Sequence, residues 1–146
     1  MRALLLENIH AEAERVLTER GFEVETRSTA LTPDELREAL QDVDYLGIRS
    51  TTDVTSEILQ QAPRLRAIGA FCIGTNQIDL HAAAQAGVAV FNAPYSNTRS
   101  VVELAIAEII ALARRLMEKN ENMHAGLWEK TAVGAPQIRG RPPRRP

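Results

Sequence analysis

The stretch AIGAFCIGTNQIDLHAAAQAGVAVF, residues 67–91, contains an apolar run, a loop, a helical segment and a second apolar run. The helical segment, residues 80–86, ends at Gly87, and glycine commonly follows the end of a helix. The same alternation begins at the N-terminus and predicts strands at residues 3–6, 22–25, 45–48, 67–70 and 88–91. Strands that alternate with helices form a parallel sheet with right-handed crossovers. We therefore predict an α/β fold with a parallel five-stranded, flavodoxin-like sheet and flanking helices.

A long apolar segment follows the last predicted strand. Ser100 and Glu103 have the spacing of a capping box, which predicts a helix from Ser100 to about residue 120. This helix is apolar on nearly every side, so part of its surface needs cover from another subunit or domain. A second helical stretch, residues 120–130, contains Trp128, and an arm follows it. We divide the chain into an α/β domain, residues 1–99, interdomain or dimerisation helices, residues 100–130, and a loop with a Pro- and Arg-rich tail, residues 131–146.

Composition and charge argue against several classes of protein. The 146 residues are 45% hydrophobic and 25% charged, as in ordinary globular domains. The net charge is −2 although four arginines lie in the last eight residues, so the body of the chain is not built for nucleic acid. The longest apolar stretch, residues 101–113, is shorter than the roughly 20 residues of a membrane span. We expect no membrane segment, and the single Cys72 indicates a reducing, cytoplasmic setting.

Two common kinds of site are not indicated by the sequence. The eight glycines form neither a GxGxxG fingerprint nor a GxxxxGK loop, so no nucleotide-binding loop is predicted. His10, His81, His124 and Cys72 lack the spacing of metal ligands, so no metal site is predicted. Cys72 lies in an apolar sequence and is interpreted as a buried, inert thiol.

Arg49 directly follows the third predicted strand. The loops that follow parallel strands gather at the carboxyl edge of the sheet, where such sheets bind ligands. A guanidinium there can hold a phosphate or carboxylate with two hydrogen bonds, and Ser50, Thr51 and Thr52 add hydroxyls and backbone amides. The alternative is an arginine that only pairs with Asp53.

Two further loops end at the same predicted edge. Gly74 allows the backbone to approach a ligand closely and tolerates a positive φ, so amides near Gly74 and Thr75 could cradle a carboxylate. A plain turn is the alternative, with Asp79 as the cap of the next helix. Asn97 precedes the long helix, whose N-terminal end favours an anionic or polar group, but it could equally be a turn residue.

Three segments, IRSTT at residues 48–52, GAFCIGTNQID at residues 69–79 and FNAPYSNTRS at residues 91–100, occur in a specific order. Together they resemble the substrate domain of the D-3-phosphoglycerate dehydrogenases, within the D-isomer-specific 2-hydroxyacid dehydrogenases. The resemblance covers residues 3–140. It implies oxidation of a small anionic 2-hydroxy acid, 3-phosphoglycerate, to 3-phosphohydroxypyruvate in serine biosynthesis, with NAD as the cofactor.

The resemblance also implies roles for single residues. Arg49 and Ser50 would contact the substrate. Gly74, with Ile73 and Thr75, would present backbone amides to the substrate carboxylate and the cofactor, and Asn97 would face the nicotinamide. Some bacterial relatives carry a second arginine at the position of Thr51, so the resemblance implies that the substrate phosphate is held more weakly here or by other groups.

The end of the chain departs from the family pattern. In the family, a segment like residues 137–140 leads into the NAD domain, whereas this chain continues with RPPRRP. We therefore expect a truncated chain without the cofactor domain, with no catalytic residue of its own and no tight NAD binding. We also expect a homo-oligomer formed through the second part of the chain. The residues predicted at that dimer contact are Val102, Ile106, Ile109, Ile110 and Trp128.

Two other functions stay open at this point. The chain could be a non-catalytic interaction protein that pairs with itself or with a full-length homologue. The tail motifs RGRP and PRRP could bind a DNA minor groove or an adaptor, and this interpretation carries the least weight because such short matches arise by chance.

Overall fold

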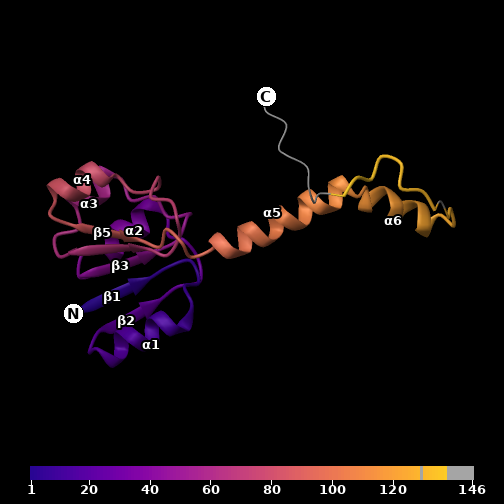
Figure 1. Cartoon of the computed structure of the whole chain (residues 1–146). Helices are drawn as coiled ribbons and strands as arrows, with labels where there is room; N and C mark the ends of the chain where they lie inside the picture. Colours follow the sequence, from indigo (N-terminus) through magenta and orange to yellow (C-terminus); the bar gives the residue numbers. More distant parts are fainter. Residues whose placement is uncertain (129, 138–146) are drawn as a thin grey trace. The chain divides into compact units, whose positions relative to one another are not determined.

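The computed structural model describes residues 1–128 and 130–137. It divides into two compact units, residues 1–96 and residues 97–146, and each is described by itself (Figure 1). Five strands form the sheet of the first unit: β1 (Arg2–Leu5), β2 (Glu23–Thr26), β3 (Tyr45–Ile48), β4 (Ala67–Ala70) and β5 (Ala89–Asn92).

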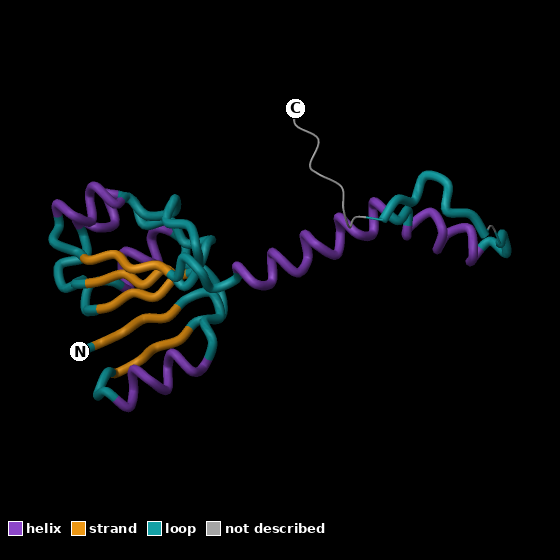
Figure 2. The backbone as a smooth tube through the Cα atoms, viewed as in Figure 1, coloured by secondary structure: helices purple, strands orange, loops and turns teal. Residues whose placement is uncertain are grey.

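All four strand pairings in the sheet are parallel, and the strand order is β2-β1-β3-β4-β5 (Figure 2). This order confirms the predicted flavodoxin-like sheet. The strand order reverses between β1 and β3, and such a switch point opens a crevice beyond the carboxyl ends of the strands. The loops after β1 and β3 therefore lie where α/β proteins of this kind place a ligand.

Short helices connect the strands of the first unit. Thr32 forms the predicted capping box with Glu35, and Asp79 caps the last of these helices by accepting a hydrogen bond from the Ala82 amide at 2.9 Å. These caps satisfy amides that a helix leaves unpaired at its start. The helices are α1 (Ala11–Glu19), α2 (Pro33–Ala39), α3 (Ser56–Gln60) and α4 (Leu80–Gln85).

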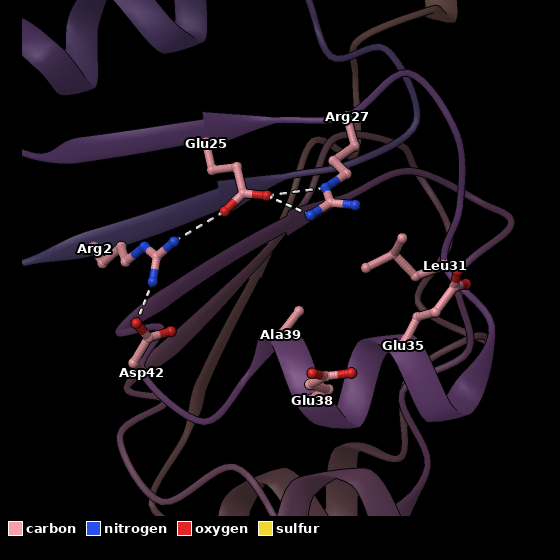
Figure 3. A pocket seen from close by; sticks show the side chains of 8 residues that line it. All are labelled: Arg2, Glu25, Arg27, Leu31, Glu35, Glu38, Ala39 and Asp42. Carbon is pink, nitrogen blue, oxygen red and sulfur yellow. Dashed lines mark hydrogen bonds and ion pairs between the residues drawn. The ribbon is translucent and has the colours of Figure 1, made fainter.

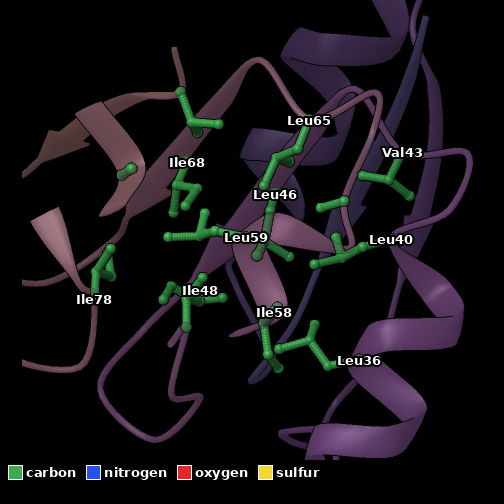
Figure 4. Close-up of a cluster of buried hydrophobic side chains, with 14 of the residues drawn as sticks. Leu36, Leu40, Val43, Leu46, Ile48, Ile58, Leu59, Leu65, Ile68 and Ile78 are labelled. Carbon is green, nitrogen blue, oxygen red and sulfur yellow. The ribbon is translucent and has the colours of Figure 1, made fainter. Parts of the chain in front are cut away.

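The hydrophobic core lies between one face of the sheet and helices α2, α3 and α4 (Figure 4). Leu36 of α2 and Ile58 of α3 pack there with Leu46, Ile48 and Ile68 of the central strands, and all five are almost fully buried. Burial of each such side chain is worth about 1.5–3 kcal/mol. The core thereby fixes the strand ends from which the loops of the candidate site emerge.

The second unit contains helices α5 (Thr98–Ala113) and α6 (Leu116–His124). The prediction of one helix from Ser100 to residue 120 was wrong at both ends. Asn97 is the N-cap, so Ser100 lies inside the first turn, and the Glu103 carboxylate pairs with Arg99 at 2.9 Å instead of forming a capping box. Arg115 has a left-handed backbone, with φ of 52°, which ends α5 because an α-helix cannot continue through that conformation.

The remainder of the second unit has no helix or strand among residues 130–137. Most of the predicted tail, including the motifs RGRP and PRRP, lies outside the described residues. In the described part of the chain, no helix has the length and apolar character needed to cross a membrane.

Candidate anion-binding site

The loops after β3 and β4 are joined to each other beyond the sheet edge. The Val54 amide donates to the Gln77 carbonyl oxygen at 2.8 Å, and the Asp79 amide donates to the Val54 carbonyl oxygen at 3.0 Å. These contacts form an isolated parallel bridge between Val54 and Ile78. The two loops that carry most of the predicted site residues are therefore held together by backbone hydrogen bonds.

The side chains of Gln77 and Cys72 contact one backbone carbonyl oxygen in each loop, that of Arg49 and that of Gly74. The Gln77 Nε2 atom donates to the Arg49 carbonyl oxygen at 2.5 Å and lies 3.5 Å from the Gly74 carbonyl oxygen. The Cys72 Sγ atom lies 3.3 Å and 3.2 Å from the same two oxygens. Cys72 is half-buried rather than fully buried as predicted: it packs against the edge of the core, and its sulfur contacts the carbonyl groups of both loops.

Glu7, the residue after Leu6 at the end of β1, is bound to the loop after β3. Its Oε2 and Oε1 atoms accept hydrogen bonds from the Thr51 and Thr52 amides at 3.0 and 2.9 Å. Burial raises the pKa of the Glu7 carboxyl, but hydrogen bonds from Thr52 and Thr51 outweigh it and lower the pKa below its ordinary value. The expectation that these two amides serve a ligand was wrong, because Glu7 already accepts from both.

Arg49 and Ser50 are exposed at the carboxyl end of β3. Among residues 1–128 and 130–137, the Arg49 guanidinium has no ion pair, and the alternative pairing with Asp53 is not formed. The loop backbone is held by Glu7 and Gln77, while the guanidinium is left free. This arrangement presents a positive charge with five N–H donors to solvent.

The loop after β4 offers backbone donors. Within the described part of the chain, the amides of Gly74 and Thr75 donate no hydrogen bond, while the Ile73 carbonyl accepts one from Asn92 Nδ2 at 2.8 Å. Gly74 does not use a positive φ; a Cβ at this position would lie 2.8 Å from the Asn76 Oδ1 atom. Among the described residues, the only close neighbour of such a Cβ is the end of the exposed Asn76 side chain, and the position does not require glycine for a left-handed turn.

Residues 3–134 match the model of the family described as "D-isomer specific 2-hydroxyacid dehydrogenase, catalytic domain". The chain belongs to this family. D-3-phosphoglycerate dehydrogenase 2 of Saccharomyces cerevisiae is 50% identical over 141 residues, which are 97% of this chain and 30% of that protein. The chain thus spans about a third of the length of the curated relatives that it matches.

Solved structures share the fold of this chain. The TT0316 protein of Thermus thermophilus has a TM-score of 0.75 at 30% identity, over 90% of this chain and 42% of that one. The NAD-dependent formate dehydrogenase of Staphylococcus aureus, solved with NAD, has a TM-score of 0.69 at 24% identity, over 92% of this chain and 45% of that one. At 24% identity, the similarity to the formate dehydrogenase shows a shared fold and nothing more.

The other predicted site residues lie in the second unit. Asn97 precedes α5, and its side chain forms no capping hydrogen bond. The five residues predicted at a dimer contact are all exposed, from 47% for Ile110 to 74% for Trp128. Neither finding tests the roles predicted for them.

A cavity of about 360 Å³ lies elsewhere in the first unit, between strands β1 and β2 and helix α2 (Figure 3). Arg2 pairs with Glu25 at 3.1 Å and with Asp42, and Arg27 pairs with Glu25 at 2.7 Å. Both arginines are therefore engaged, unlike Arg49, and this cavity is not a comparable anion site. In the described part of the chain, no group of three or more His, Cys, Asp and Glu residues could hold a metal ion.

Proposed function

We propose that this chain is the substrate-binding part of an NAD-dependent oxidoreductase that acts on a small anionic 2-hydroxy acid of the 3-phosphoglycerate type. The observation that carries the proposal is the exposed Arg49 guanidinium at the carboxyl end of β3, which has no ion pair among the described residues. Such a guanidinium binds a phosphate or carboxylate through two parallel hydrogen bonds. Similarity to D-3-phosphoglycerate dehydrogenases supports the choice of substrate.

The proposed contacts divide between the two loops. Arg49 and Ser50 bind the anionic group of the substrate from the β3 loop. The amides of Gly74 and Thr75 bind its carboxylate from the β4 loop, because neither amide donates a hydrogen bond within the described part of the chain. Two residues are proposed to face the cofactor, namely Ile73 and Asn97.

The turn after β1 differs from the glycine-rich turn of a dinucleotide-binding fold. A dinucleotide fold has a glycine-rich turn after its first strand, whereas the β1–α1 turn here carries Glu7, Asn8 and Ile9. A carboxylate at that turn repels a pyrophosphate. We therefore propose that the isolated chain binds NAD negligibly and has no dehydrogenase activity by itself, and that the hydride transfer of the family belongs to the longer proteins.

Exposed apolar side chains support a second candidate function, self-association or pairing with a full-length homologue. Val102, Ile106, Ile109 and Ile110 are each about half exposed on α5, and Trp128 is 74% exposed. Exposed apolar surface of this kind marks interaction sites. We propose a homo-oligomer, a cytoplasmic location, and the division of the chain at residues 99 and 130.

Calorimetric titration of the chain with 3-phosphoglycerate tests the substrate proposal. Arg49→Ala should weaken binding by about 1.5–3 kcal/mol, or one to two decades of affinity. Arg66→Ala is the control for the loss of an exposed arginine: Arg66 precedes β4 at the opposite edge of the sheet, where its Nε atom lies 4.0 Å from the Asp44 carboxylate. Equal losses in both variants, or no binding by the wild-type chain, would refute the proposal.

A further inference from the structure

The Glu7 carboxylate is buried against the loop that carries Arg49, with 9% of the residue exposed. Its two oxygens accept hydrogen bonds from the Thr51 amide at 3.0 Å and from the Thr52 amide at 2.9 Å. Two successive peptide units are thus fixed by one side chain that lies 44 and 45 positions away in the sequence. Arg49 and Ser50 directly precede those two peptide units.

The backbone that supports Glu7 is itself held on two sides. Glu7 and Asn8 both have left-handed backbones, with φ of 61° and 55°, which residues with a Cβ atom adopt rarely. The Leu6 amide donates to the Gly47 carbonyl oxygen at 2.9 Å, and the Asn8 amide donates to the Arg27 carbonyl oxygen at 3.2 Å. The carboxylate is therefore presented from a defined point between β1 and β3, the switch point of the sheet.

A buried carboxylate at this place is costly in two ways. Removal of its charge from water is unfavourable, and a negative charge near an anion site opposes the ligand that Arg49 attracts. The carboxylate does not attract an anionic ligand, so ligand binding offsets neither cost. Both are offset if the carboxylate serves to fix the loop, because two amide donors satisfy its oxygens and hold the loop backbone in one place.

We propose that Glu7 is a positioning residue for the anion site: through the Thr51 and Thr52 amides it sets the place from which Arg49 and Ser50 reach the ligand. The inference rests on the proposed function and adds to it a residue that does not touch the substrate. A displacement of the guanidinium by about 1 Å is enough to weaken such a contact severely.

The first test compares two isosteric variants of buried carboxylates. Glu7→Gln should weaken 3-phosphoglycerate binding about tenfold, because it replaces an acceptor with a donor facing an amide. Asp44→Asn is the matched control: Asp44 is 3% exposed and accepts from the Arg2 amide at 2.8 Å, but it precedes β3 at the opposite sheet edge. The control should lower the urea midpoint while affinity stays within about twofold. Equal losses of affinity in both variants would overturn the inference.

The second test needs no ligand, and its first measurement uses the wild-type chain alone. In the wild-type chain, NMR hydrogen exchange should be slower at the Thr51 and Thr52 amides than at those of Gly74 and Thr75. In Glu7→Gln, exchange at Thr51 and Thr52 should accelerate. Fast exchange at both threonines in the wild type overturns the role of Glu7. If exchange is slow but the wild type binds no 3-phosphoglycerate, the proposed function fails while the loop contact stands.

Discussion

The side-chain Nε2 atom of Gln77 lies 2.5 Å from the backbone carbonyl oxygen of Arg49, 28 positions earlier in the sequence. This hydrogen bond connects the loop after β4 to the loop after β3. Gln77 is buried, with 6% of the residue exposed, so bulk water cannot replace the contact. A buried hydrogen bond within the protein therefore connects the two loops that are proposed to bind one ligand.

Replacement of this glutamine should lower both stability and affinity. Gln77→Met keeps the length of the side chain but removes the donor to the Arg49 carbonyl, which should cost about 1–3 kcal/mol of unfolding free energy. We expect 3-phosphoglycerate affinity to fall as well. Urea denaturation and calorimetry measure the two effects. Gln85→Met is the control, since Gln85 is exposed and its side-chain amide pairs with His81 at 3.0 Å, and an equal effect there contradicts the prediction.

Acid should destabilise the chain partly through Glu7. Its folded pKa is lowered, so its contribution to stability is present above the ordinary glutamate pKa of 4.5 and is lost as the pH falls through the folded pKa. We expect the unfolding free energy to decline below that pH, and to decline less steeply in Glu7→Gln. Urea titrations between about pH 3 and pH 7 provide the comparison. If the unfolding free energy of the wild type and of Glu7→Gln declines equally steeply with falling pH, the predicted contribution of Glu7 is wrong.

The isolated chain should not bind or reduce NAD. The turn after β1 carries a carboxylate instead of glycines, and no fingerprint is present in the sequence. Calorimetry with NAD should detect no binding at micromolar concentrations, and mixtures with 3-phosphoglycerate should show no NADH absorbance. A dissociation constant in the micromolar range would show that this prediction is wrong.

The chain should associate at tens of micromolar, a range suited to ordinary dimer affinities. Burial of an isoleucine is worth about 1.5–3 kcal/mol, so Ile106→Glu should shift light scattering toward the monomer. Leu104→Glu is the matched control, because Leu104 lies on the opposite side of α5 from Val102 and Ile106. A monomeric wild type, or equal effects of both variants, would refute the predicted contact.

Most of the fold could be predicted because its signals are local. The strands at residues 45–48 and 67–70 have the predicted bounds, and Thr32 and Asp79 cap helices as expected, since apolar runs and capping residues act within a few positions. The break between α5 and α6 could not be predicted, because Arg115 is an ordinary helix former and nothing in its neighbours signals a left-handed backbone.

The order of apolar runs and loops along the chain is enough to place Arg49, Ser50, Gly74 and Thr75 after the ends of parallel strands, because a parallel sheet brings those ends to one edge. Which groups of these loops are free and which are already bound depends on the folded arrangement. Glu7 directly follows the first apolar run, and this position was the only feature of the sequence that could have suggested a role at the sheet edge. Its contact with Thr51 spans 44 positions and could not be predicted from neighbouring residues. Hydrogen bonds between distant loops depend on strand order and register, and these are set by packing of the whole sheet rather than by any local pattern.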